Sequence, residues 1–529
     1  MIHDIDATLA AAQQHYVGGR LAEAASLLHG VLAVRPECAP ALEGLAYVAA
    51  RQGDPDRAAD YILRAFETLS PSPSQYFAAA NICQAARRHR HAERFFALCL
   101  RTLPDHVPAR LGRALSLAEL GEHSRALKML ERLTAAHPQS AELHYNKGCV
   151  LGKMGRYDGE MAAYRKALSI APDFTVARVN LGVALRDLHR FDEALQEFGR
   201  ALEIDADHAG ARTNRAQTNL LLGHLESGWR EYEWRWLDGG QSHNFDPATL
   251  WKGDQPIAGK TVLLHFEQGL GDTLQFVRYA DLLVHAGARV VLRVQDALLP
   301  LLRDYPGVAQ VIGENDAVPA FDLHCPLLTL PLAFRTGAKT IPAAVPYLKA
   351  DPQRSAQWRA VIDTLPRRPR VGIAWAGSRH HPDDRNRSIP FAELAPLFAT
   401  RASFVSLQKD VRESDRASIT RFASLLDVSG RLETYADTAA LISQLDLVIS
   451  VDTSVAHLAG ALGVPVWVAL PFTPDWRWQL NRSDSPWYPQ ARLFRQSTRG
   501  NWKSVVDAMT AALTAWTPET ADAAQKVTS

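Results

Sequence analysis

The sequence has few cysteines, no long apolar run and no excess of either charge. Its five cysteines are an odd number, and none stands in a C-x-x-C pair, which favours free thiols in a reducing compartment. The acidic N-terminus lacks the apolar core of a secretion signal, and no apolar stretch is long enough to span a bilayer. With 58 basic and 57 acidic residues, no overall field attracts nucleic acid or an anionic membrane. We therefore expect a cytoplasmic protein without nucleic-acid binding or stable membrane insertion.

A period of 34 residues runs through residues 5 to about 240. Glycine suits the turn between paired helices, alanine lets the helices approach, and proline ends the second helix. The turn register is held by Gly19, Gly53, Arg87, Gly121, Gly155, His189 and Gly223, the alanine register by Ala24, Ala58, Ala92, Ala126 and Ala194, and the proline register by Pro36, Pro104, Pro138 and Pro172. The array resembles tetratricopeptide repeats, although Glu160 replaces the expected alanine. This resemblance predicts an N-terminal α-solenoid of about seven repeats over residues 1–240.

A solenoid of helix pairs exposes a long groove that usually holds a peptide or protein segment. The alternative is that the repeats only support the second half of the chain or assemble it into a homo-oligomer. The last unit is rich in aromatic residues, which predicts a capping helix that seals the solenoid against the next domain: Trp229, Tyr232, Trp234 and Trp236. The glycine-rich and polar residues 239–244 mark the expected boundary.

From residue 261 onward, short apolar strands alternate with helices, as they do in a parallel sheet. One series begins with strands at residues 262–265 and 288–294, and a second begins with strands at residues 371–375 and 404–407. Residues 351–369 form the expected connector. We therefore predict two Rossmann-like α/β domains, residues 241–350 and 351–500, that face each other across a cleft.

The second series ends in a β-α-β unit over residues 446–478. A short apolar strand leads into Asp452 and Thr453, which start a helix that Gly463 stops, and a second buried strand follows. The free backbone N–H groups at the start of such a helix suit a phosphate. An ordinary capped helix in an α/β sheet is the alternative reading of this turn.

A glycine turn ends the first strand of the first series. Gly269 and Gly271 let the backbone approach a ligand, and Asp272 stands at the carboxyl edge of the sheet, where α/β proteins bind ligands. Helix capping by Asp272 is equally plausible on this evidence, because aspartate is a favoured residue at a helix start.

A third motif follows the strand at residues 371–375. Arg385 and Arg387 lie in the next loop, and their forked donors suit a diphosphate. The adjacent His380 and His381 with Asp383 invite a metal reading, but no second pair with ligand spacing supports it.

In this order and spacing, the three motifs resemble those of GT-B glycosyltransferases, most closely the bacterial heptosyltransferase-like group, glycosyltransferase family 9. The resemblance covers roughly residues 260–515, and it implies a GT-B fold whose first domain is completed by a C-terminal helix over residues 501–516. It makes Asp272 the catalytic base and places Arg387 where the family more often has lysine. It also implies a nucleotide-diphosphate sugar as donor, bound by Gly269, Gly271, Gln275, Trp375, Gly377, Arg385, Arg387, Gln408, Lys409, Asp452, Thr453, Ser454, His457, Asp475 and Trp476.

Two of these donor-site predictions have an open alternative. His457 either faces the cleft and bonds the sugar, or fills the space between helix and sheet. The loop of Asp475, Trp476, Arg477 and Trp478 either stacks a base or sugar, or packs between the domains.

The chemistry expected of these residues needs no metal and no cofactor. No D-x-D triplet follows residue 240, so Arg387, the helix start at Thr453 and Lys409 would stabilise the leaving diphosphate. Asp272 would take the proton of an acceptor hydroxyl, with inversion at the sugar carbon. The favoured acceptor is a polypeptide in the repeat groove. The alternatives are a lipid-linked or polysaccharide acceptor, and a scaffold that binds nucleotide sugar without turnover.

Overall fold

The computed structural model describes residues 4–68, 71–239, 245–379, 381 and 383–516. Its contacts divide the chain into two compact units: residues 1–185 with 203–205, and residues 186–202 with 206–529. The sequence places the boundary at residues 239–244, of which 240–244 lie outside the described residues. The division between the compact units falls inside the sixth repeat, because the last repeat helices pack with the α/β part of the chain.

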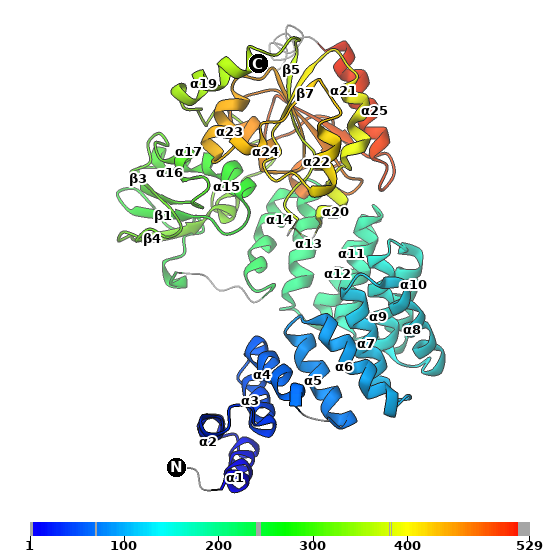
Figure 1. Ribbon diagram of the computed structural model, residues 1–529. Coiled ribbons are helices and arrows are strands. Elements are labelled where there is room, and N and C mark those ends of the chain that lie inside the picture. The colour runs from blue at the N-terminus through cyan, green and yellow to red at the C-terminus, as the bar shows by residue number, and fades with distance from the viewer. Residues whose placement is uncertain (1–3, 69–70, 240–244, 380, 382, 517–529) are drawn as a thin grey trace. The chain divides into compact units, whose positions relative to one another are not determined.

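Seven helix pairs follow one another in the described part of residues 5–232, which confirms the predicted repeats. In chain order they are α1 (Ile5–Val17), α2 (Leu21–Val34), α3 (Ala39–Arg51), α4 (Pro55–Thr68), α5 (Pro73–Ala85), α6 (His89–Thr102), α7 (Val107–Glu119), α8 (His123–Ala136), α9 (Ala141–Lys153), α10 (Tyr157–Ile170), α11 (Thr175–Asp187), α12 (Phe191–Ile204), α13 (Ala209–Leu221) and α14 (Leu225–Tyr232). Figure 1 shows the pairs α1 to α10 of the first unit in blue and cyan. In the described part of the chain, no helix is both long and apolar enough to cross a bilayer.

Each repeat turn holds one residue in the left-handed backbone region, at the position that the 34-residue register predicts. The five glycines there have φ values from +70° to +84°, while Arg87 and His189 reach +54° and +59°. A side chain in this region costs about 1 kcal/mol, which explains why glycine is the usual residue. The alanines of the register are fully buried between the helices. In the fifth repeat, Gly152 leaves room for Glu160, since a methyl group added to this glycine would lie 2.7 Å from Cδ of Glu160.

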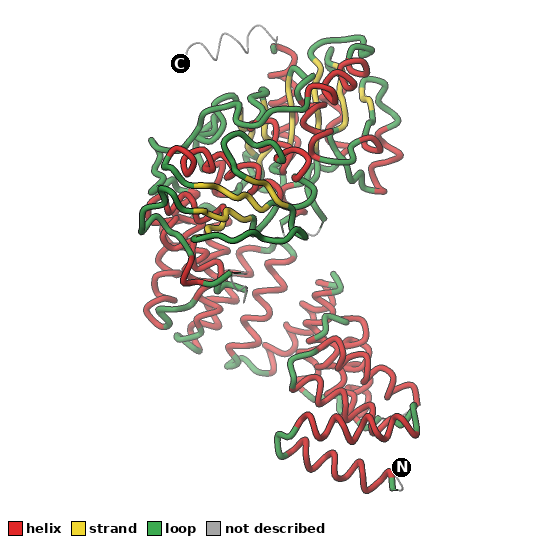
Figure 2. The backbone as a smooth tube through the Cα atoms, turned by 90° about the vertical axis from the view of Figure 1, so that its left-hand side faces the viewer, coloured by secondary structure: helices red, strands yellow, loops and turns green. Residues whose placement is uncertain are grey.

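Two parallel sheets follow the repeats, and Figure 2 shows their strands as two separate groups. The first sheet has the order β3-β2-β1-β4, and the second has the order β10-β9-β8-β5-β6-β7. Their strands are β1 (Thr261–His265), β2 (Arg289–Arg293), β3 (Gln310–Ile312), β4 (Leu323–Pro326), β5 (Arg370–Ala374), β6 (Ser403–Ser406), β7 (Leu425–Leu426), β8 (Leu447–Val451), β9 (Val466–Leu470) and β10 (Ala491–Arg495). Within each sheet, the strand order reverses direction next to the first strand, which is the doubly wound order of Rossmann-like domains. We call residues 245–350 the first lobe and residues 351–516 the second lobe.

The lobes also contain short helices between their strands. They are α15 (Leu270–Phe276), α16 (Ala280–His285), α17 (Leu299–Leu302), α18 (Leu330–Ala333), α19 (Pro352–Ile362), α20 (Asp384–Arg387), α21 (Ala395–Phe398), α22 (Glu413–Ile419), α23 (Tyr435–Ile442) and α24 (Ser454–Ala461). The longer helix α25 (Trp502–Ala515) follows the last strand. The strands of the second sheet alternate between two hydrophobic clusters, as Leu447, Val448 and Ile449 do in β8. Both faces of this sheet are therefore covered, as parallel sheets require.

The C-terminal helix α25 covers the second sheet and does not complete the first lobe, so the predicted crossing is wrong. Its apolar residues at spacings of three and four, such as Trp502, Val505 and Met509, belong to the same cluster as Val371 and Phe404. Figure 1 shows α25 beside α21, with which it is in contact. The helical periodicity is correct, but it does not encode which sheet the apolar stripe will cover.

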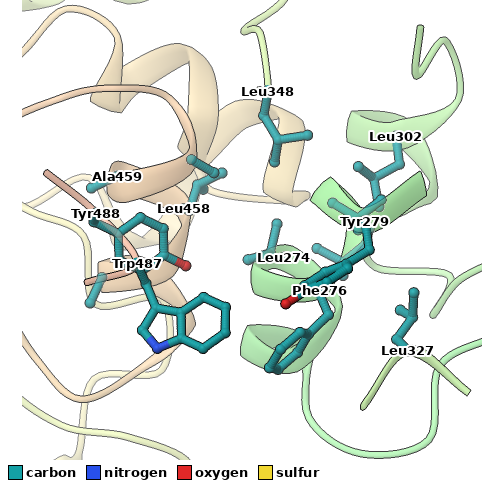
Figure 3. Packing of buried hydrophobic residues seen from close by; sticks show 14 of the residues in the cluster. Leu274, Phe276, Tyr279, Leu302, Leu327, Leu348, Leu458, Ala459, Trp487 and Tyr488 are labelled. Carbon is teal, nitrogen blue, oxygen red and sulfur yellow. The ribbon is translucent and has the colours of Figure 1, made fainter. Parts of the chain in front are cut away.

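A single hydrophobic core joins the two lobes and the last repeat. Figure 3 shows Leu274, Phe276 and Tyr279 of the first lobe facing Trp487 and Tyr488 of the second lobe. Trp229 of α14 belongs to this core: it is 2% exposed, meets the ring of Trp476 edge-on at 5.1 Å, and donates its indole N–H to the carbonyl of Thr336 at 3.0 Å. The capping role predicted for the aromatic residues of the last repeat is therefore confirmed for Trp229.

A buried ion pair fixes the same end of the repeats to the first lobe. Arg235 follows α14 and donates two hydrogen bonds of 2.8 Å to Glu267, which lies just beyond β1. The Arg235 side chain is 5% exposed and that of Glu267 is 3% exposed. Burial raises the pKa of Glu267, and the guanidinium opposes that shift. Since an unpaired buried charge is strongly destabilising, this pair holds the last repeat in one position beside the glycine turn.

We expect Trp229→Ala to lower the free energy of unfolding of the second unit by about 3 to 5 kcal/mol, because it leaves a large cavity in the shared core. Trp234 of the same segment is half-buried and packs against Arg212. The control Trp234→Ala should therefore cost less than about 1 kcal/mol. Urea denaturation followed by tryptophan fluorescence measures both, since all 12 tryptophans stand at position 229 or later. Equal losses in the two variants would contradict a core that depends on the last repeat.

Candidate functional site

The glycine turn of the first lobe lies at the point where the strand order reverses. It follows β1, between the neighbouring strands β2 and β4, where α/β proteins bind ligands. Gly269 precedes α15, and its backbone N–H donates to Oδ2 of Asp272 at 2.7 Å. Asp272 therefore does cap this helix, from the third helical position and not from the cap position itself. Its other carboxylate oxygen remains for a second partner.

The corresponding point of the second lobe holds the other two motifs. Trp375 follows β5 and Asp452 follows β8, and these two strands are neighbours at the reversal. Thr453 is the N-cap of α24 and accepts a hydrogen bond from the N–H of Val455 at 3.3 Å. Ser454 Oγ lies 2.5 Å from the hydroxyl of Tyr435. The helix start predicted from sequence is confirmed, and its N–H groups have the orientation that suits an anion.

The two lobes meet where α15 packs on α24. A methyl group added to Gly271 would lie 3.0 Å from Cδ2 of His457 and 3.6 Å from Cα of Ser454. Only glycine fits this approach without a shift. At this point the helices are in direct contact, so the prediction of a cleft between the domains is wrong here. The three motifs nevertheless come together at one place.

Arg477 joins the carboxylates of the two lobes. It lies in the short helix η7 (Trp476–Trp478) of the second lobe and is 7% exposed. Its guanidinium donates to Oδ1 of Asp272, to Oε1 of Gln275 at 2.8 Å and to Oδ1 of Asp475 at 2.9 Å. One buried cation therefore orients Asp272 and Gln275 of the first lobe together with Asp475 of the second lobe.

Burial changes the protonation of the groups around Arg477. It raises the pKa of Asp272 above its ordinary value, and the nearby Arg477 opposes that shift. Burial, reinforced by Asp475, raises the pKa of Asp452 to about 6. Carboxyl groups with raised pKa values at the strand ends of an α/β protein are typical of a functional site.

The arginine loop of the second lobe is held in place by a glycine and by hydrogen bonds. A methyl group added to Gly377 would lie 2.7 Å from Cζ of Arg387, so the guanidinium needs glycine beneath it. Arg387 donates to the backbone carbonyl of Asp452 at 3.2 Å. Arg412 pairs with Asp384 at 2.6 Å and thereby fixes α20, which carries Arg387. The arginine loop therefore contacts the chain just before α24.

His457 and Trp476 do not face a cleft, so their predicted donor contacts are wrong. His457 is 4% exposed, its Nδ1 lies 2.9 Å from the hydroxyl of Tyr488, and its ring stacks on Trp478. Burial lowers its pKa well below the ordinary value, so it is a neutral packing residue. Trp476 is 5% exposed and packs against Trp229. In both cases the packing alternative, which the sequence left open, describes the structure.

Other predicted donor residues have structural partners or lie at the surface. The Trp375 indole donates to Asp415 at 2.9 Å, and the Gln408 side chain accepts from the backbone N–H of Ala376 at 3.0 Å. Lys409 donates to the carbonyl of Glu433 at 2.7 Å, while Arg385 is exposed. Trp375 and Gln408 therefore support the loop that contains Gly377. His380, named in the metal reading, lies outside the described residues.

Sequence reasoning placed Arg477 in a loop that stacks or packs, and it missed the role of its charge. A signal was present, because Arg477 is two positions from Asp475 and is flanked by two tryptophans. An arginine among aromatic residues is well suited to a buried ion pair. Its distant partners, Asp272 and Gln275, could not be identified from sequence spacing.

Comparisons with known proteins match the first part of the chain to repeat families and a later part to a transferase family. Residues 9–73 and 111–173 match one family model described as tetratricopeptide repeat, residues 176–204 match a second model with that description, and residues 339–507 match glycosyltransferase family 9 (heptosyltransferase). The chain is similar to Protein FlbA of Caulobacter vibrioides (strain ATCC 19089 / CIP 103742 / CB 15), with 28% identity over 486 residues that cover 85% of this chain and 80% of that protein. It therefore carries tetratricopeptide repeats followed by a glycosyltransferase family 9 domain, which supports glycosyltransferase activity.

Two solved structures are similar to the repeats. A tetratricopeptide repeat protein from Parabacteroides merdae ATCC 43184 has 14% identity and a TM-score of 0.40, covering 45% of this chain and 94% of its own. MamA from Desulfovibrio magneticus RS-1 has 19% identity and a TM-score of 0.29, covering 32% of this chain and 96% of its own.

The raised pKa of Asp452 makes stability depend on pH. The folded state favours the protonated carboxyl of Asp452. The stabilisation that this preference adds to the free energy of unfolding is fully present below the ordinary pKa of 3.8 and is lost as the pH rises through about 6. Asparagine at this position does not ionise. Relative to Asp452→Asn, we expect the wild type to lose about 2 kcal/mol of unfolding free energy between pH 4.5 and pH 8.

Urea denaturation at the two pH values measures this difference. The exposed Asp304 serves as the control, and Asp304→Asn should differ from the wild type by the same amount at both pH values. A difference for Asp452→Asn that does not change with pH would contradict a strongly shifted carboxyl at this position.

Proposed function

We propose that this protein is an inverting, metal-independent glycosyltransferase that moves a sugar from a nucleotide-diphosphate donor to a hydroxyl group of a polypeptide. The observation that carries the proposal is the meeting of the glycine turn at Asp272 with the start of α24 and with Arg387. These groups come from three separate parts of the chain, and each lies at a strand reversal where α/β proteins bind ligands.

Asp272 is the group best suited to act as the base. Arg477 and the N–H of Gly269 fix the carboxylate in one orientation, while burial brings its pKa closer to the working range of a general base. The acceptor O–H would donate its proton to Asp272 as the acceptor oxygen bonds the sugar carbon. The bond from that carbon to the diphosphate breaks at the same time, which inverts the configuration.

The leaving diphosphate gains one negative charge when the bond to the sugar carbon breaks, and it needs fixed donors to stabilise that charge. Arg387 supplies a guanidinium whose Nε is buried and has no hydrogen-bond partner among the described residues. The first N–H groups of α24 lie next to it, since Arg387 bonds the carbonyl of Asp452. Donors that are already oriented stabilise developing charge without reorganisation, so a divalent cation is not needed for this step.

The first unit offers a place for a polypeptide. A cavity of about 420 Å³ lies along α5, α7 and α9, the first helices of three successive repeats. It is lined mainly by apolar side chains with a polar rim: Phe77, Val107, Pro108, Leu111, Leu115 and Leu143, with Asn81, Gln84, His137, Ser140 and Glu142. Repeat arrays use such surfaces for protein segments, which favours a polypeptide acceptor over a lipid-linked one or a polysaccharide.

Asp272→Asn is expected to lower turnover at least 100-fold, because the variant lacks the proton acceptor. The assay incubates the full chain with a panel of nucleotide-diphosphate sugars and a bacterial lysate, and it measures mass shifts of intact proteins. The exposed Asp304→Asn of the same lobe is the control and should retain full turnover.

The same assay separates the alternatives. Unchanged turnover with EDTA is expected of a metal-independent transferase. Sugar found only in extracted lipid or polysaccharide would replace the polypeptide acceptor, and donor binding without any product would leave a scaffold. Full activity of Asp272→Asn would remove Asp272 as the base.

Gly377→Ala is expected to weaken binding of the nucleotide diphosphate about tenfold or more, because the added methyl group displaces the guanidinium of Arg387. Gly430 of the same lobe has no atom within 4 Å of an added methyl group, so Gly430→Ala is the matched control. Calorimetry with the nucleoside diphosphate that most raises the melting temperature measures both. Equal affinity in the two variants would show that Arg387 does not bind the donor.

A further inference from the structure

The turn of the sixth repeat carries a side chain where most repeats have none. His189 stands in the left-handed region between α11 and α12, at the register position that glycine fills in five of the seven repeats. Arg87 of the third repeat is the other exception. A residue other than glycine at such a position needs a compensating contact, and for His189 that contact lies in the second lobe.

The ring of His189 stacks on Phe472 of the second lobe. The ring centroids are 4.0 Å apart and the planes differ by 11°, so the contact is close and nearly parallel. The neighbouring Asp187 accepts hydrogen bonds through its backbone carbonyl from Thr473 at 3.0 Å and from Arg499 at 3.2 Å. The C-terminal end of α11 and the turn after it therefore contact the chain immediately beyond β9.

Phe472 and Thr473 begin the segment that carries the buried ion pair. Residues 471–479 follow β9 and include Asp475 and Arg477, and Asp475 accepts from the N–H of Arg477 at 2.9 Å. The turn of the seventh repeat lies at the other end, where a methyl group added to Gly223 would be 3.6 Å from Nε2 of Gln479. Two successive repeat turns therefore contact the two ends of the segment that presents Arg477 to Asp272.

We propose that the sixth repeat turn is part of the transferase site, and that His189 is a positioning residue which acts through Phe472 to hold residues 471–479 so that Arg477 meets Asp272. The inference rests on the proposed function for its effect on turnover. The claim that His189 holds residues 471–479 in place does not depend on turnover and rests on the contacts of His189. The repeat array then serves two purposes, because its middle repeats offer the proposed polypeptide surface and its sixth and seventh repeats shape the site.

The experiment compares His189→Gly with Arg87→Gly in the full chain. Both variants place glycine in a left-handed turn and relieve the same backbone restriction, but only the first removes a contact with residues 471–479. Hydrogen exchange followed by mass spectrometry should show faster exchange of residues 471–479 in His189→Gly alone. Turnover should fall about 10- to 100-fold in this variant, with the KM for the donor changed less than threefold, because a displaced Arg477 misplaces Asp272.

His189→Phe keeps an aromatic ring and should restore both slow exchange and turnover, whereas His189→Asn tolerates the backbone without a ring and should not. Unchanged exchange of residues 471–479 in His189→Gly overturns the proposal, whatever the activity. Faster exchange with wild-type turnover also overturns it, because the segment would then not position the site. If the wild type transfers no sugar at all, the proposed function fails, and the exchange data alone decide whether His189 holds the segment.

Discussion

The guanidinium of Arg477, buried between carboxylates of two lobes, is the interaction on which the rest of the site depends. A charge that is 7% exposed is tolerated only when its partners are fixed and correctly placed. Asp272 and Gln275 must therefore both stand in α15, and Asp475 must stand beside Arg477 in the second lobe. This requirement brings α15 onto α24 and explains why Gly271, with no side chain, occupies the contact.

The last repeat also helps to hold Asp272 in place, through contacts with the first lobe. Trp229 enters the hydrophobic core that both lobes share, and Arg235 pairs with Glu267 five residues before Asp272. Two buried arginines thus fix the segment between β1 and α15, one from the repeats and one from the second lobe. A helix pair that ended the solenoid without entering this core would leave the glycine turn held on one side only. For this reason the compact unit begins inside the repeats and not at the start of the first lobe.

Short sequence patterns predicted the repeat turns and the β-α-β unit. They did not predict which residues far apart in the sequence are in contact. The 34-residue register identified every repeat turn, since a left-handed residue is a property of its own backbone. The β-α-β unit at Asp452 was equally local. The neighbour of α25, by contrast, depends on which sheet its apolar stripe meets, and the sequence shows only the stripe. His457 has a helical position that fits either a ligand or a core, and the stack on Trp478 decides it.

The balance of charge in the site constrains how a diphosphate could enter. Asp272, Asp452 and Asp475 stand with the two cations Arg387 and Arg477, so these side chains carry one surplus negative charge when all three carboxyls are ionised. A diphosphate bound as proposed would add further negative charge beside Asp452. Because burial raises the pKa of Asp452 to about 6, this carboxyl takes up a proton close to neutral pH, which would relieve the repulsion. Arg477 meanwhile favours ionised Asp272, the state that a base requires. Burial thus raises the pKa of both carboxyls, and the direct ion pair with Arg477 opposes that shift at Asp272.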